Sequence, residues 1–181
     1  MKNSLSEEEI TSRVAFIMAL DLDPMKVKLI SPTEGLGWTR MKADLVELQY
    51  RQFLILTLKY PEAHIVPSRE VDTFWHQHIL DTMKYSEDCQ KAFGHFLHHF
   101  PYFGMRGQQD AENLKCAFAA TQALFKKEFG DVMLGSGSEC DEGGESTSCD
   151  SAQCSPAECH NRVPRDLSRP SMSSLNALLG V

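Results

Sequence analysis

The chain has 181 residues, a hydrophobic content of 42% and a formal net charge of −7. This length accommodates one domain and an appendage, and the apolar content is sufficient for a core. An acidic chain lacks the basic face that nucleic-acid binding requires, so no nucleic-acid partner is expected. The longest largely apolar run, FLILTL, is far too short to span a bilayer, so no membrane partner is expected either.

The N-terminus and the cysteines bear on the expected location. The first ten residues, MKNSLSEEEI, are polar and acidic where a secretory signal would be basic and then apolar. We therefore expect a cytoplasmic protein whose six cysteines are mostly thiols. Under those conditions, metal binding or redox chemistry explains the cysteines better than a disulfide framework does.

Two short helices are predicted near the N-terminus. Ser6 and Glu9 are spaced as in a capping box, and apolar residues follow at helical spacing. Asp23 and the proline after it begin a second helix, which we expect to end near Ile30. The run SPTEGLGW that follows is rich in turn-forming residues and predicts a loop.

Longer helical patterns follow. One helix is predicted from about residue 39 to residue 60, where Pro61 stops it. Its buried side chains are expected to be Leu45, Leu48, Phe53, Leu56 and Tyr60. Ser68 is placed to cap a further helix that continues to about Met83.

Three more helical segments are predicted after residue 83. They cover residues 86–93, one or two turns within residues 94–100, and a final helix over residues 110–129 that Gly130 ends. No segment combines an alternating pattern with hairpin turns, so strands are not expected. The predicted fold class is all-α, an irregular helical bundle.

The composition changes sharply near Leu134. We expect a helical, histidine-rich domain at residues 1–134 and a tail at residues 135–181, which carries seven acidic and three basic residues. The Cys-, Ser- and Gly-rich part of this tail has few large apolar residues and cannot offset the entropy of ordering. We therefore expect the tail to be flexible and disordered.

The tail leaves several interpretations open. Its cysteines are Cys140, Cys149, Cys154 and Cys159. They lack the C-x-x-C spacing of a zinc ribbon, but flexible thiolates could still wrap a soft ion such as zinc or copper(I). The alternative is a solvated linker with incidental cysteines. Further on, Leu175, Leu178 and Leu179 could form one amphipathic turn that docks on a protein partner or on the domain.

Five of the seven histidines lie between residues 74 and 104. Asp72 and His76 are four apart, so on a helix they share a face and could bind one ion jointly. Asp72 could instead orient the His76 ring, or the two could be a plain surface pair. His78 points about 160° away from His76 on a helix, so the HQH run is not a bidentate site there.

A second group of histidines follows. If residues 94–100 are helical, His95 and His99 share a face with His98 beside it, which is the relation found in zinc-binding HExxH helices. The glutamate of that motif is absent, so nothing indicates a peptidase. The alternative is that one or two of these are core histidines that donate to backbone carbonyls.

A composite metal site is the leading hypothesis, because a short connection joins the helices that carry the two groups. Its ligands would be Asp72, His76, His95 and His99, with His78, His98 and Cys89 as alternates. Nitrogen and oxygen ligands suit zinc, iron or copper(II) without choosing among them. For Cys89 two other interpretations stand, a small buried hydrophobe or a thiolate activated by nearby histidines.

The runs VPSREVDTFWHQHILDTMKYSEDC and FGHFLHHFPYFG resemble the glycine-rich domain-containing protein-like family over about residues 23–129. The most specific parts of the pattern are EVDxFWHxHILDT and YxxDC. They contain Asp72, Trp75, His76, His78, Asp88 and Cys89. The resemblance implies a small helical domain, often followed by a low-complexity tail, and it implies no agreed reaction or catalytic role.

Three classes of function remain. The first is a metal-binding protein with the His/Asp site and a soft-metal tail. The second is a protein-interaction module that uses an aromatic groove and the tail. The third is a metalloenzyme of unknown reaction, which ranks last because no nucleophile elbow, P-loop or dinucleotide fingerprint is present.

Overall fold

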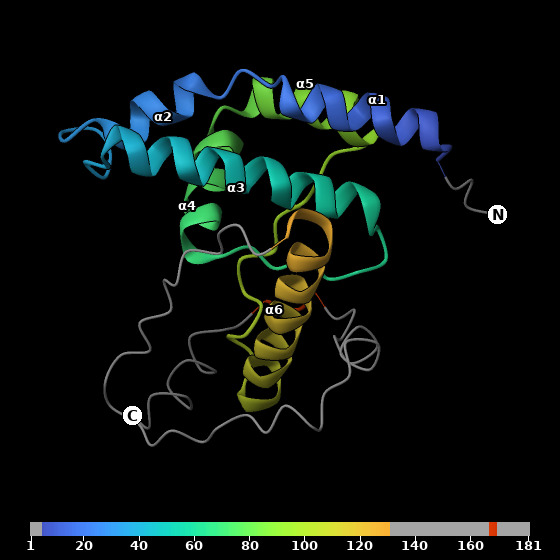
Figure 1. Ribbon diagram of the computed structural model, residues 1–181. Helices are drawn as coiled ribbons and strands as arrows, with labels where there is room; N and C mark the ends of the chain where they lie inside the picture. Colours follow the sequence, from blue (N-terminus) through green and yellow to red (C-terminus); the bar gives the residue numbers. More distant parts are fainter. Residues whose placement is uncertain (1–4, 131–166, 170–181) are drawn as a thin grey trace, which may run out of the picture. The chain divides into compact units, whose positions relative to one another are not determined.

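The computed structural model describes residues 5–130 and 167–169, and these contain six helices and no strand (Figure 1). The predicted all-α fold class is therefore confirmed for the described part of the chain. The chain divides into two units, one of Met1–Glu62 and Pro67–His98, the other of Ala63–Val66 and His99–Val181.

Most of the tail lies outside the described residues. This holds for the predicted boundary at Leu134, the disorder, the four tail cysteines and the docking turn near the C-terminus. Residues 167–169 are described, and all three are exposed and non-helical.

The first unit holds α1 (Glu7–Met18), α2 (Asp23–Ile30), α3 (Arg40–Lys59), α4 (Arg69–Leu80) and α5 (Thr82–Phe93). α3 packs against α1, α2 and α4, and α5 packs against α1 and α4 (Figure 1). α2 also contacts α4, so α4 is held by three neighbours.

Local side chains explain why these helices begin where they do. The Ser6 Oγ accepts from the Glu9 N–H at 3.2 Å, and the Glu9 carboxylate accepts from the Ser6 N–H at 2.8 Å, so the predicted capping box is present. Thr39 and Ser68 accept in the same way at the starts of α3 and α4. α2 begins with proline in its first turn, where a missing N–H leaves no helical bond unmade.

The helix predicted from Ser68 to Met83 ends earlier, at Leu80. Asp81 has φ −82° and ψ 72°, outside the helical region, and its Oδ1 accepts from the Lys84 N–H at 3.4 Å. Asp81 therefore caps α5, which begins at Thr82 rather than at residue 86.

The helical turns predicted within residues 94–100 are wrong. Gly94 has φ 78°, a left-handed conformation that favours glycine, and it ends α5. Residues 95–100 are not helical, and Pro101 further disfavours a helical conformation just before it. His95 and His99 therefore do not share a helical face, and the geometric reason for pairing them is lost.

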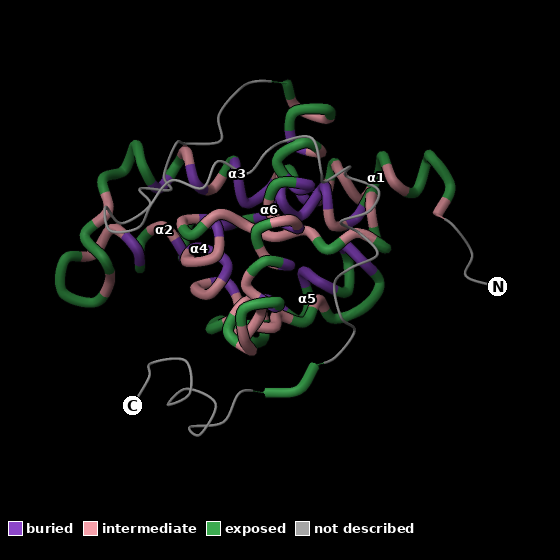
Figure 2. The backbone as a smooth tube through the Cα atoms, turned by 90° about the horizontal axis from the view of Figure 1, so that it is seen from below, coloured by how far each residue is buried: buried purple, intermediate pink, exposed green. Residues whose placement is uncertain are grey.

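The core of the first unit is rich in aromatic residues. The rings of Tyr50 and Phe74 lie 5.3 Å apart and those of Phe53 and Trp75 lie 5.0 Å apart, which joins α3 to α4. In Figure 2 the buried positions recur along the helices between exposed and half-buried ones.

The predicted buried side of α3 is partly correct. Phe53 and Leu56 are buried, and Leu45 and Tyr60 are half-buried. Leu48, however, is 42% exposed, so its predicted burial is wrong. A residue two positions from the buried Tyr50 points about 160° away from it on a helix, which explains the exposure.

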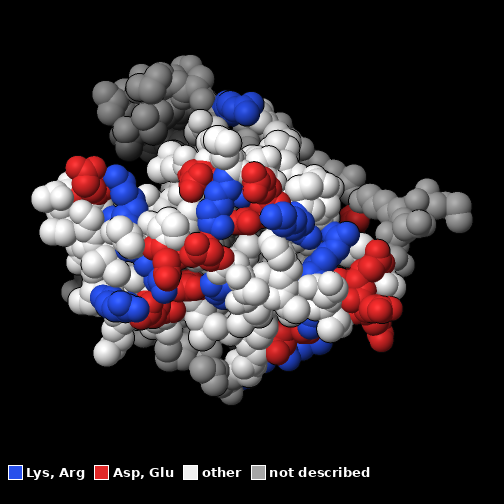
Figure 3. Space-filling view, turned by 90° about the horizontal axis from the view of Figure 1, so that it is seen from above, with Lys and Arg blue, Asp and Glu red and all other residues white. Residues whose placement is uncertain are grey.

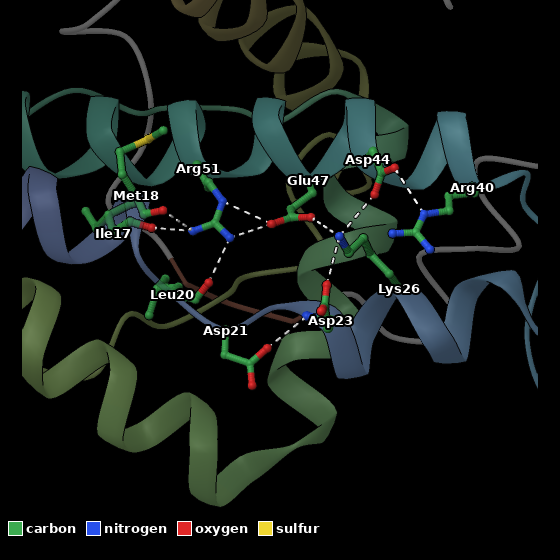
Figure 4. Close-up of polar contacts among 10 residues, drawn as sticks. All are labelled: Ile17, Met18, Leu20, Asp21, Asp23, Lys26, Arg40, Asp44, Glu47 and Arg51. Carbon is green, nitrogen blue, oxygen red and sulfur yellow. Dashed lines mark hydrogen bonds and ion pairs between the residues drawn. The ribbon is translucent and has the colours of Figure 1, made fainter.

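Arg51 is a buried charge that the apolar pattern of α3 did not predict. Its Nη1 donates to the carbonyls of Ile17 at 2.7 Å and Met18 at 3.0 Å, and its Nη2 donates to that of Leu20 at 2.8 Å (Figure 4). Carbonyls at the end of a helix have no partner within the helix, so this guanidinium satisfies the end of α1. Glu47, one turn before Arg51, accepts from it.

Lys26 extends this network to α2. Its Nζ lies 2.6 Å from Glu47 and 2.9 Å from Asp23, and the hydrogen bonds to these carboxylates raise the pKa of Lys26 (Figure 4). On the face shown in Figure 3, acidic and basic side chains are interspersed, in keeping with such ion pairs. None of the helices in the described ranges is both long and apolar enough to cross a membrane.

The second unit contains α6 (Gln108–Phe129). The Asp110 Oδ2 accepts from the N–H groups of Gly104 at 2.7 Å and Arg106 at 3.2 Å, and the Arg106 Nη2 lies 2.7 Å from the other carboxylate oxygen. These contacts order the turn before α6. The Val66 N–H donates to the Thr121 hydroxyl at 2.9 Å, which attaches residues 63–66 to the same helix.

Candidate metal centre

α4 presents different chemistry on two sides. Its buried side chains are Val71, Phe74, Trp75 and His78. Asp72 and His76, at four-residue spacing, lie on a different side, roughly 120° around the axis from the centre of the buried face. One helix thus carries a buried histidine and a partly exposed Asp–His pair.

The Asp72–His76 pair has a geometry suited to a metal ion. The His76 Nε2 lies 3.5 Å from the Asp72 Oδ2, and the two side chains are 45% and 33% exposed. This separation is long for a hydrogen bond. It matches the roughly 3.4 Å between two ligands of a tetrahedral ion at about 2.1 Å from each. The pair predicted from helical spacing therefore exists, and solvent reaches it.

His78 belongs to a buried polar network. The Tyr50 hydroxyl lies 2.9 Å from the His78 Nδ1, and the Asp88 Oδ2 lies 3.0 Å from the Nε2. Since a carboxylate only accepts, the Nε2 carries the hydrogen and the Nδ1 accepts from Tyr50. The Lys84 Nζ donates to the same Asp88 oxygen at 2.8 Å. A metal ion at His78 would have to displace one of these partners.

Burial keeps the His78 imidazole and the Tyr50 hydroxyl neutral. His78 is 1% exposed, and burial lowers its pKa although Asp88 opposes the shift. Burial likewise raises the pKa of Tyr50 well above its usual range, so its hydroxyl remains a donor.

Cys89 lies beside a second pair of hydrogen bonds. The Trp75 Nε1–H donates to the Tyr85 hydroxyl at 3.0 Å, and that hydroxyl donates to the Leu97 carbonyl at 2.6 Å. Cys89 is 3% exposed, and burial raises the pKa of its thiol. A nucleophile or thiolate ligand needs a lowered pKa and access, so this environment suits a small packing residue.

The remaining predicted ligands lie after α5. His95 and His98 are exposed, and their rings pack beside Phe93 and Phe96 respectively. His99 is half-buried and is the first residue of the chain segment 99–181 that belongs to the second unit.

The aromatic residues of the histidine-rich stretch differ in burial: Phe96 is exposed, and Phe100, Tyr102 and Phe103 are half-buried. Phe74, Trp75 and Phe93 are all buried. These three rings stabilise the first unit by packing.

The partners of His78 were not foreseen. Its own burial has a local signal, because it falls on the apolar side of the helix with Phe74 and Trp75. The Lys84–Asp88 ion pair also has a local signal, because the two residues are four apart on a helix. Tyr50 lies 28 residues away on another helix, and no local pattern indicates its contact with His78.

A family model described as UCP032817-like matches residues 12–124, more than half of the chain. No curated protein and no solved structure matches the chain. The expected membership of a glycine-rich domain-containing protein-like family is therefore wrong. Several residues of the pattern behind it, among them Trp75, His78 and Asp88, form hydrogen bonds between helices, a packing role that does not identify a family.

Proposed function

Because the chain belongs to the UCP032817-like family, a name that describes no activity, we propose its function from geometry: it binds a divalent transition-metal ion through Asp72, His76 and His99. The observation that carries the proposal is the solvent-accessible Asp72–His76 pair, with its ligand atoms 3.5 Å apart.

The third proposed ligand is His99. Asp72, His76 and His99 form a group that could hold a metal ion. Ligands of one transition-metal ion are separated by about 3–4 Å, and the Asp72–His76 pair already meets this distance. This proposal replaces His95 of the expected set, because the segment that would have aligned His95 with His99 is not helical.

The donor atoms define the class of ion. Two imidazole nitrogens and one carboxylate oxygen suit zinc, iron or copper(II), whereas magnesium and calcium prefer oxygen ligands alone. Three protein ligands leave at least one position for water or another molecule, as in catalytic rather than closed structural zinc sites. The proposal therefore includes an ion that is accessible from solvent.

Metal content tests the proposal. The full chain, purified without a polyhistidine tag and with its four tail cysteines changed to serine, should retain about one equivalent of Zn²⁺ after loading and dialysis. Asp72→Ala, His76→Ala and His99→Ala should each weaken Zn²⁺ binding at least roughly tenfold in calorimetric titration.

His95→Ala is the matched control, since His95 is an exposed histidine near His99 in the chain and outside the proposed site. It should bind Zn²⁺ as the parent does. Retention of less than about a tenth of an equivalent by the parent, or an equal loss in His95→Ala, would refute the site.

A further inference from the structure

We infer that the buried hydrogen-bond chain Tyr50–His78–Asp88 fixes the rotation of α4 about its axis and so aims Asp72 and His76 at the ion. In this role Tyr50, His78 and Asp88 are positioning residues of the metal site. The inference rests on the proposed function, because it concerns the direction of two of the proposed ligands.

α4 is anchored through the His78 ring to two other helices. The His78 Nδ1 is bonded to Tyr50 of α3 and its Nε2 to Asp88 of α5. The hydrophobic contribution of the same helix is non-directional and depends on the area that stays buried. Hydrogen bonds weaken steeply with angle, so they resist rotation of α4 about its axis.

A small rotation of α4 changes where its two ligand atoms lie. Ligand atoms roughly 6 Å from the helix axis move about 1 Å when the helix turns by 10°. Metal–ligand distances are met to within about 0.2 Å, so such a turn shifts both ligands of α4 relative to the remaining ligands of the ion. Asp72 and His76 move as a pair because they lie on the same helix.

Each side chain of the Tyr50–His78–Asp88 hydrogen-bond chain has a partner. Lys84 neutralises the Asp88 carboxylate at 2.8 Å, and no buried side-chain nitrogen or oxygen in the described part of the protein lacks a partner. Deleting the Tyr50 hydroxyl therefore leaves the His78 Nδ1 without its donor. The His78 ring must then rotate or bind a water molecule, and either change alters the orientation of α4.

Tyr50→Phe is the test, because it removes one hydroxyl and keeps the ring that packs against Phe74. We expect Co²⁺ to bind roughly tenfold more weakly to this variant, the size of effect seen when groups supporting a ligand are changed. The visible absorption bands of bound Co²⁺ should also change, since they report the arrangement of the ligands. Both are measured on the full chain with serine at the tail cysteines.

A merely structural role predicts a different result. Ile17→Val removes a buried methyl group from α1, which packs against α3 and α5, and should destabilise the unit without altering Co²⁺ affinity or absorption. Asp88→Asn keeps an oxygen acceptor for the Nε2–H and should retain more affinity than Asp88→Leu.

The outcomes separate the two proposals. A parent protein that binds no Co²⁺ refutes the metal site itself. A parent that binds Co²⁺ while Tyr50→Phe gives the same affinity and spectrum refutes the positioning role and leaves the site intact. An equal loss of affinity in Ile17→Val also refutes the positioning role.

Discussion

Cys89 is a buried side chain whose surroundings limit its chemistry. Cys89 was a candidate ligand from its place between two groups of histidines. Its burial raises the pKa of the thiol and removes it from solvent, so its surroundings oppose formation of a thiolate.

We predict that Cys89 resists alkylation in the native protein. At pH 8, iodoacetamide should modify it much more slowly than Cys116, which is half-buried, because both access and thiolate fraction are reduced at Cys89. Peptide mapping by mass spectrometry distinguishes the two sites. The difference should vanish in urea, and equal labelling of both cysteines in the native state would contradict the prediction.

Asp110 is a second residue with a testable environment. Although burial opposes its ionisation, hydrogen bonds from Arg106 and from the Gly104 N–H lower the pKa of the carboxyl. The unfolded chain therefore binds a proton at higher pH than the folded one. The contribution of Asp110 to stability is present above the unfolded value of about 3.9 and is lost as pH falls toward the folded pKa.

Asp110→Asn should consequently lower the free energy of unfolding at pH 7, and its difference from the parent should shrink as the pH falls from 5 to about 2. Urea denaturation at several pH values measures this difference. Glu112→Gln, at an exposed position of the same helix, is the control. A difference that grows on acidification would show that the sign is wrong.

At the scale of helices, charged groups join α1, α2 and α3. Arg51 satisfies the last carbonyls of α1 from α3 and pairs with Glu47, which also binds Lys26 of α2. A buried charge with these partners tolerates no apolar replacement, because its partners would be left unsatisfied.

Arg51→Met should therefore lower the free energy of unfolding by about 3 kcal/mol, within the range for breaking a buried ion pair. The exposed Arg40→Met, whose side chain lies on the same helix and pairs with Asp44, should change it by less than about 1 kcal/mol. Urea denaturation followed by circular dichroism measures both, and equal losses would contradict the role assigned to Arg51.

The sequence predicted helices well where their ends have local signals. The proline after Asp23 and the glycine at position 130 place the ends of α2 and α6 within a few residues. It failed at Asp81, a cap within a continuous helical pattern, and at residues 94–100, where Gly94 ends α5 in a left-handed conformation and no helical turn follows.

At the scale of the whole molecule, what could be predicted depended on distance along the chain. The Asp72–His76 pair was foreseen because both residues lie within about one helical turn. The link from Tyr50 to His78 joins two helices, and a single sequence contains no signal for it. The family assignment rested on two short runs within residues 66–104, whereas the family model that matches the chain covers residues 12–124.

The two histidines of α4 also restrict how this helix can change. One residue inserted at position 77 would turn the segment before it by about 100° relative to the segment after it. Either the His78 imidazole would leave the interior, or the side chains of Asp72 and His76 would turn toward the interior. A change in the length of α4 between residues 72 and 78 would therefore disrupt either the buried network or the candidate metal site.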